Sequence, residues 1–310
     1  MNRHFCFILL VTATFTVQSE ELPKMEKAHR GWVNAVAVSP NYIATAGDDD
    51  QVFLWHIPGL KLAGQLKLGG KGATALAFHP TEQILAVGGW NGKIILWDYQ
   101  AKKTINVGGH RENITALQWA NGGQHLISGS GDDAIRIWNR KTQKCENILT
   151  HENEYDIAGL NIPHDSELLI SVDGDAEIRV WSTKTWKELE SLSGHEGAIT
   201  EIASSRSGKM FATASRDKTI ILWDTASRKK IRQLFEHQAD VTHLTWGKDD
   251  NTLISVDEEN NLLFWNLTKG KTVKTIRKNQ NITSLQYSYK LDILILGGKQ
   301  GSIFEKLPVN

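Results

Sequence analysis

Six short apolar segments that each close on a tryptophan recur along the chain at intervals of 41 to 43 residues. Apolar residues alternate or run together over only a few positions in each segment, which is the pattern of a short β-strand. Such a repeat constrains the fold more than any other feature, because one kind of structural unit has to account for the whole chain. The segments are DDQVFLWH at Trp55, NGKIILWD at Trp97, DDAIRIWN at Trp138, DAEIRVWS at Trp181, DKTIILWD at Trp223 and ENNLLFWN at Trp265.

The length of the repeat predicts the fold class. A period of about 40 to 45 residues with this ending is typical of a four-stranded propeller blade. A degenerate seventh copy, LGGKQGSIFEKL, places Lys306 where the other units have tryptophan. Because stacking around an axis covers the edges of each blade, seven units predict a closed ring. We therefore predict an all-β, seven-bladed β-propeller of four-stranded antiparallel blades over residues 20–310.

Other residue types recur in phase with the tryptophan in five of the units. A histidine opens the unit, Ser or Thr stands ten residues before the tryptophan, and an acid stands six before it. A buried indole N–H needs an acceptor, which a hydroxyl supplies, and an imidazole can join that hydroxyl to a carboxylate. These residues predict a structural hydrogen-bond network. Its expected members are His29, Thr45, Asp49, Trp55, His110, Ser128, Asp132, Trp138, His151, Ser171, Asp175, Trp181, His195, Thr213, Asp217, Trp223, His237, Ser255, Glu259 and Trp265.

On these motifs, the chain after residue 19 resembles the WD-repeat (WD40) β-propeller family. The resemblance implies a ring closed by an N-terminal strand, here Leu22–Lys27 beside Gly301–Leu307. It also implies an interaction scaffold, although a fold alone is a weak guide to any particular partner. We therefore expect a protein or peptide partner, with the chain a monomer or part of a hetero-complex.

The first residues predict a secretory signal peptide over residues 1–19. A basic residue precedes an apolar run from Phe5 to Val17, and the small Ser19 ends the segment. The run is shorter than the roughly 20 apolar residues that cross a bilayer, so no stable membrane span is expected. Export to the periplasm or the extracellular space follows. The alternative is a cytoplasmic assembly scaffold, which Cys145, the one cysteine outside this segment, would suit because it can form no internal disulfide.

Charge and motif content argue against several function classes. Lys plus Arg and Asp plus Glu number 35 each, so no overall field draws the chain to nucleic acid. The Ser, His and acid sets occur once per unit and lack a G-x-S-x-G elbow, which disfavours a hydrolase. Dispersed histidines cannot share a zinc ion, and the acidic turns fit no calcium loop. We predict no enzyme, metal or cofactor. N-glycosylation sequons stand at Asn113, Asn266 and Asn281.

Two tryptophans fall outside the repeat pattern. Trp90 precedes the acid slot of the second unit, where Asn91-Gly92 predicts a tight hairpin turn, and Trp32 lies in the loop that opens the first. Both loops are expected on one ring face, either covering each other or forming a contact patch. The predicted partner-binding residues are Trp32, Trp90, Lys71, Asp48, Arg216, Asp240 and Glu258. The alternative is an enzyme or small-ligand binder that uses the central channel.

Overall fold

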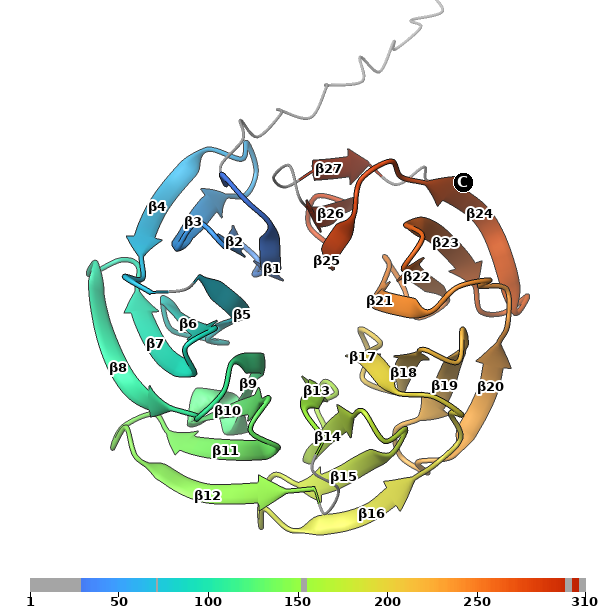
Figure 1. Ribbon diagram of the computed structural model, residues 1–310, viewed down its shortest axis with the longest axis horizontal. Coiled ribbons are helices and arrows are strands. Elements are labelled where there is room, and N and C mark those ends of the chain that lie inside the picture. The colour runs from blue at the N-terminus through green and yellow to red at the C-terminus, as the bar shows by residue number, and fades with distance from the viewer. Residues whose placement is uncertain (1–28, 71, 152–154, 299–302, 307–310) are drawn as a thin grey trace, which may run out of the picture.

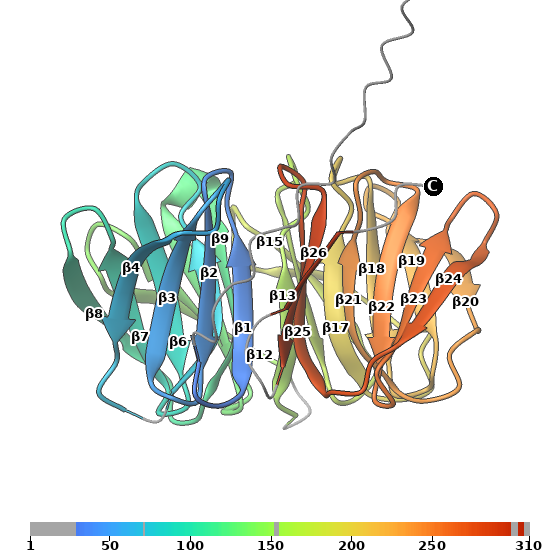
Figure 2. The ribbon, with the colours of Figure 1, turned by 90° about the horizontal axis from the view of Figure 1, so that it is seen from above.

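The computed structural model describes residues 29–70, 72–151, 155–298 and 303–306. Antiparallel sheets are arranged radially around a central axis (Figure 1). Seen from the side, the molecule is a flat disc (Figure 2). The predicted all-β propeller of antiparallel blades is confirmed. Six sheets have four strands, and the sheet of β25, β26 and β27 has three.

The predicted number of seven four-stranded blades is therefore wrong. The structure has six such blades, because β27 forms the outer edge of the last sheet within the described residues. The strand expected to complete that sheet, Leu22–Lys27, lies outside the described residues, as do Gly301 and Leu307. The closure of the ring by this strand stays a prediction.

Each sheet runs from the axis outward in chain order. The innermost strands are β1 Val33–Val38, β5 Ala73–Phe78, β9 Ile114–Ala120, β13 Ile157–Asn161, β17 Ile199–Ser204, β21 Val241–Trp246 and β25 Ile282–Ser288. The second strands are β2 Tyr42–Gly47, β6 Ile84–Gly89, β10 His125–Ser130, β14 Leu168–Asp173, β18 Met210–Ser215, β22 Thr252–Asp257 and β26 Ile293–Gly298. The third strands are β3 Gln51–His56, β7 Lys93–Asp98, β11 Ala134–Asn139, β15 Ile178–Ser182, β19 Ile220–Asp224, β23 Asn261–Asn266 and β27 Ile303–Lys306. The outer strands are β4 Leu62–Lys67, β8 Lys103–Gly109, β12 Cys145–Thr150, β16 Glu188–Leu192, β20 Lys230–Leu234 and β24 Lys271–Arg277, and a single 3-10 turn, η1, spans Asn121–Gly123.

The core lies between neighbouring blades, because each sheet buries both of its faces near the axis. Trp97 of the second blade packs against Ala44 and Leu54 of the first, and the other repeat tryptophans fill equivalent gaps. Trp119 and Trp246 instead tie blades through hydrogen bonds, since their indole N–H groups donate to the carbonyls of Ala77 (3.1 Å) and Ala203 (3.0 Å) in the preceding blade. Burial of these side chains holds the blades together, and Cys145, the one cysteine among the described residues, is free.

The strand order creates two distinct faces of the disc. The blade-to-blade connections and the turns between second and third strands emerge on one side, which we call the connector face. The turns between first and second strands, and between third and outer strands, emerge on the other side, which we call the hairpin face. No described helix is long and apolar enough to cross a bilayer.

Candidate functional site

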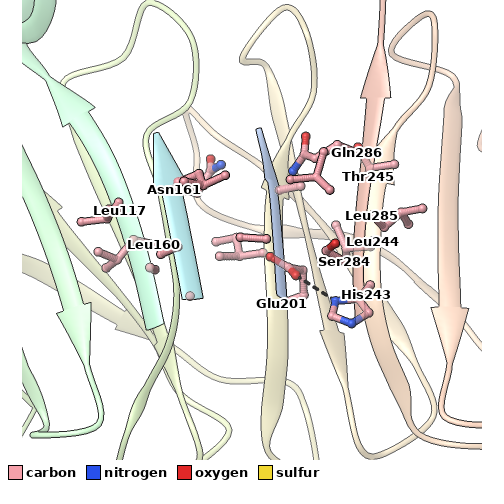
Figure 3. A pocket seen from close by; sticks show the side chains of 18 of the residues that line it. Leu117, Leu160, Asn161, Glu201, His243, Leu244, Thr245, Ser284, Leu285 and Gln286 are labelled. Atoms are coloured by element: carbon pink, nitrogen blue, oxygen red, sulfur yellow. Dashed lines mark hydrogen bonds and ion pairs between the residues drawn. The ribbon is translucent and has the colours of Figure 1, made fainter. Parts of the chain in front are cut away.

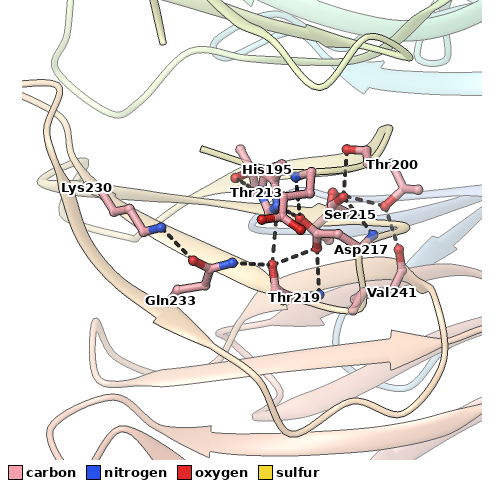
Figure 4. A network of polar contacts seen from close by, with 12 residues as sticks. His195, Thr200, Thr213, Ser215, Asp217, Thr219, Lys230, Gln233 and Val241 are labelled. Carbon is pink, nitrogen blue, oxygen red and sulfur yellow. Dashed lines mark hydrogen bonds and ion pairs between the residues drawn. The ribbon is translucent and has the colours of Figure 1, made fainter. Parts of the chain in front are cut away.

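The fifth blade contains a continuous chain of buried hydrogen bonds (Figure 4). The indole N–H of Trp223 donates to Thr213 Oγ1 at 3.0 Å, and His195 Nε2 lies 2.8 Å from the same hydroxyl. His195 Nδ1 lies 2.8 Å from Asp217 Oδ2. Thr219 then donates to the other carboxylate oxygen at 2.7 Å. Each polar group of this chain is satisfied, so the network fixes the turn to the strands behind it.

The same arrangement occurs in the first and third blades. In the third blade, for example, Ser128 Oγ accepts from Trp138 at 2.8 Å and lies 2.7 Å from His110 Nε2. His110 Nδ1 lies 2.7 Å from Asp132. The set in the first blade is His29, Thr45, Asp49 and Trp55.

The acid of the fourth and sixth blades differs from the sequence prediction. Asp175 and Glu259 do not contact the histidine; Asp173 and Asp257, two residues earlier, take that role. Asp257 Oδ2 lies 3.0 Å from His237 Nδ1, while its Oδ1 accepts the N–H of Glu259 at 3.1 Å. An acid at the end of the second strand thus both binds the histidine and caps the turn. The remaining members are His151, Ser171, Trp181, His237, Ser255 and Trp265.

The second blade has no such network. Val87 occupies the hydroxyl position, so the acceptor that the tryptophan uses in the other network blades is missing here. The side chain of Asn91 lies beside Gly70 and Gly89, and a cavity of about 40 Å³ remains there. The three-stranded sheet likewise carries Leu296 at the hydroxyl position.

Burial sets the electrostatics of these networks. It lowers the pKa of His110, His195 and His237, so these rings are neutral at neutral pH. Burial would raise the pKa of Asp217, but hydrogen bonds from Thr219, the Glu196 N–H and His195 together lower it. The hydroxyls have no solvent exposure, so no substrate can reach them as nucleophiles. Their chemistry is structural.

On the connector face, backbone hydrogen bonds bring predicted partner-binding residues together in pairs. The N–H of Asp48 donates to the carbonyl of Trp32 at 3.0 Å, and that of Glu258 donates to Asp240 at 2.9 Å. The equivalent bonds join Arg216 to Ala198 at 2.9 Å and Trp90 to Gly72 at 3.2 Å. Each pair therefore combines one turn residue with one connection residue near the channel mouth.

One half of this face is hollowed into a cavity of about 850 Å³. Arg216, Asp240 and Glu258 line it together with Tyr155 and Asp156, which the sequence interpretation missed. Tyr155 is 50% exposed and its ring lies over Gly174. We call this cavity the mouth cavity.

The other predicted partner-binding residues lie elsewhere. Trp32, Trp90 and Asp48 are on the first two blades and do not line the mouth cavity. Trp90 is 48% exposed, whereas Trp32 is half-buried. Lys71 lies outside the described residues. A single aromatic at an otherwise polar turn, such as Tyr155 in the connection before β13, is the signal that could have indicated the mouth cavity.

Side-chain hydrogen bonds join some neighbouring blades near the connector face. Thr74 Oγ1 donates to the carbonyl of Ile114 in the next blade at 2.5 Å, and Thr200 to that of Val241 at 2.6 Å. Thr115 Oγ1 is buried without a hydrogen-bond partner, and the corresponding residue of the fourth blade is Ala158, which has no hydroxyl. Both Thr115 and Ala158 line the mouth cavity. Thr200, which makes such a bond, lines the cavity as well, so the cavity spans blades with and without this bond.

The central channel has a volume of about 460 Å³ and a polar lining (Figure 3). Glu201 points toward His243 and pairs with it at 3.4 Å. Asn161 and Ser284 also line the channel, where their Oδ1 and Oγ atoms lack protein partners. Within the described ranges, no three His, Cys, Asp or Glu side chains are grouped to hold a metal ion.

Comparison with known proteins agrees with the repeat pattern. Residues 21–56, 64–98, 101–139 and 186–224 match the family described as WD domain, G-beta repeat. Residues 210–290 match the anaphase-promoting complex subunit 4 WD40 domain.

Similar curated proteins include three with informative names. Anaphase-promoting complex subunit cdh1 of Dictyostelium discoideum is 27% identical over 44% of this chain and 18% of its own length. WD repeat-containing protein 18 of Bos taurus is 29% identical over 35% of this chain and 28% of its own. Cell division cycle 20.1, cofactor of APC complex, of Arabidopsis thaliana is 28% identical over 40% of this chain and 28% of its own length. The match thus spans less than a third of the length of each of these relatives.

Proposed function

We propose that this chain, a β-propeller built of WD40 repeats, is a non-enzymatic scaffold that binds a protein or peptide on its connector face. The mouth cavity is the observation that carries the proposal. Its volume of about 850 Å³ is large enough to admit a side chain or a short extended segment of a partner. Tyr155 and Arg216, which line it, are of the residue types that are enriched at interfaces.

The charges around the cavity support the same proposal. Within the described part of the chain, the side chains of Asp156, Arg216, Asp240 and Glu258 have no hydrogen bond or ion pair. These four charges are therefore available for a partner. The names of two relatives, which place them with the anaphase-promoting complex, agree with a role in a protein assembly.

The first two blades offer a second contact patch on the same face, formed by Trp32, Trp90 and Asp48. Two sets of substitutions separate the two halves. We expect Asp240→Asn with Glu258→Gln to weaken binding of the natural partner about tenfold, since buried polar contacts across an interface are each worth about 1 kcal/mol or more. Trp32→Ala with Trp90→Ala should have a comparable effect if that half also contacts the partner.

Binding of the co-purifying partner, measured by titration calorimetry, checks both sets. The control is Asp165→Asn with Glu167→Gln, which makes the same charge change on the hairpin face, where these side chains are 88% and 63% exposed. Equal affinity in all variants would contradict the proposal for this face.

We also propose that residues 1–19 are a signal peptide that is removed on export. Sequencing the N-terminus of the mature protein should find Glu20 first; an intact Met1 would contradict export. Cleavage at this point would retain Leu22–Lys27, which we propose as the fourth strand of the sheet of β25, β26 and β27.

Removal of that strand should destabilise the ring. A chain that begins at His29 should melt several degrees lower than the mature protein, because the edge of β27 would lose its strand partner and its cover. Thermal melts followed by circular dichroism provide the measurement. An unchanged melting temperature would show that this segment does not close the ring.

A further inference from the structure

The turns between third and outer strands repeat one backbone geometry around the disc. In each of the six complete blades one residue of this turn has a left-handed backbone, with φ between 50° and 65°. Its N–H commonly donates to the carbonyl of the last residue of the third strand, as from Trp186 to Ser182 at 2.8 Å and from Arg228 to Asp224 at 2.8 Å. The left-handed residues are Leu60, Lys102, Gln143, Trp186, Arg228 and Gly270.

The residue that follows the left-handed one is lysine in all six blades. Because the turns are equivalent, these lysines lie at equivalent positions around the outer edge of the hairpin face. All six are exposed, and none has a carboxylate partner within the described residues. We call this set the lysine ring, and its members are Lys61, Lys103, Lys144, Lys187, Lys229 and Lys271.

The surroundings of the lysine ring strengthen its charge. Between the bounding strands the six turns contain no Asp or Glu, but Asp98 and Asp224 end the third strands beside two of them and accept hydrogen bonds from the turn backbone. The turns also add further basic residues. Only three of these pair with a nearby acid within the described ranges: Arg140 with Glu82, Lys184 with Glu167 and Arg228 with Glu190. Closer to the axis, the turns between first and second strands carry both signs, with the acids Glu82, Asp165, Glu167, Asp249, Asp250 and Asp292 against the bases Arg206, Lys209, Lys248 and Lys290. The additional basic residues of the outer turns are Lys102, Arg140, Lys141, Lys184, Arg228 and Lys269.

The opposite face carries the compensating acids. The chain has equal numbers of acidic and basic residues, but the two faces of the disc differ in charge. Acids on the connector face include Asp48, Asp50, Glu112, Asp133, Asp156, Glu177, Glu196, Glu236, Asp240, Glu258 and Glu259, whereas its described loops hold the bases Arg30, Arg111, Arg216, Lys218 and Lys278.

We propose that the lysine ring docks the hairpin face onto the surface of a bilayer that contains acidic phospholipids. The basic turns lie on one side of a flat disc and are spread around its edge, so a planar anionic surface meets them all at once. A nucleic-acid duplex, which is a rod, would meet only those of one or two blades. Basic residues near an anionic membrane act additively, and salt weakens their attraction.

This docking fixes the orientation of the molecule. With the hairpin face on the membrane, the connector face and the mouth cavity point away from it. The lysine ring does not depend on the mouth cavity, so membrane binding and partner binding are separate properties. Together they would hold a protein partner at a lipid surface.

Co-sedimentation of the full chain with vesicles tests the proposal. We expect binding to vesicles of equal parts phosphatidylserine and phosphatidylcholine at low salt, release at high salt, and no binding to phosphatidylcholine alone. Lys144→Gln with Lys187→Gln and Lys229→Gln should weaken binding about tenfold or more, since each basic residue contributes to the attraction.

The matched control removes three lysines from the connector-face side of the disc, with Lys67→Gln, Lys93→Gln and Lys218→Gln. These residues are also exposed, and the net charge changes equally. Circular dichroism verifies that both variants are folded. Equal losses in the two variants, equal binding to neutral vesicles, or displacement from the vesicles by duplex DNA at equal phosphate concentration would each overturn the proposal.

Discussion

Asp257→Ala should lower the free energy of unfolding by about 1–3 kcal/mol, because it leaves buried hydrogen-bond donors unsatisfied. Asp257 is 2% exposed and accepts hydrogen bonds from His237, from the backbone of Glu259 and from the backbone and side chain of Asn261. Glu259→Ala should change the stability by less than about 0.5 kcal/mol, since its side chain is 54% exposed and its ion pair with Arg277 is long, at 3.7 Å.

Denaturant unfolding of the two variants beside the unchanged chain provides the measurement. The two variants are closely matched, because the residues are two positions apart and each substitution removes one carboxylate. A larger loss for Glu259→Ala than for Asp257→Ala would restore the assignment made from the sequence.

Acidification should destabilise the ring through its buried histidines. Burial lowers the pKa of His79, His110, His195 and His237 below the ordinary value of 6.5. The unfolded chain therefore binds protons that the folded chain does not, and the free energy of unfolding falls as the pH drops below about 6.5. Each such histidine contributes at most about 1.4 kcal/mol per pH unit.

The network carboxylates do not contribute to this loss of stability between about pH 7 and about pH 5 in the same way as the histidines. Asp49, Asp132 and Asp217 have lowered pKa values, so their contribution is lost only as the pH falls below their ordinary value of 3.8. Burial raises the pKa of Asp173, which acts in the opposite direction.

The slope of unfolding free energy against pH, measured between about pH 7 and about pH 5, checks the histidine account. We expect a positive slope in the unchanged chain and a slope lower by up to about 1.4 kcal/mol per pH unit in His195→Gln. An equal slope in the variant would show that the buried histidine is not a source of the acid sensitivity.

The repeat made the fold predictable, because its tryptophans and hydroxyls are spaced by the geometry of the blade itself. Two network acids were misassigned because a fixed spacing from the tryptophan ignores what an acid can do at a strand end. The motif Ser-Val-Asp, present at Ser171–Asp173 and Ser255–Asp257 and absent from the other units, was the available signal.

The faces of the disc could not be predicted in the same way. The mouth cavity depends on residues from several blades, which only their arrangement around the axis brings together. Equal numbers of acidic and basic residues predicted no electrostatic attraction, but the sum of charges does not reveal on which face each one lies. The number of complete blades also depended on strand pairing beyond the repeat itself.

Site-specific photocrosslinking to the co-purifying partner tests the central claim most directly. Benzoylphenylalanine is placed at Tyr155, beside the mouth cavity, or at Leu189 on the outer strand β16; the two side chains are 50% and 49% exposed, so accessibility is matched. A scaffold that binds through the connector face should give a crosslinked partner from position 155 and none from position 189. A crosslink from position 189 alone would contradict that account.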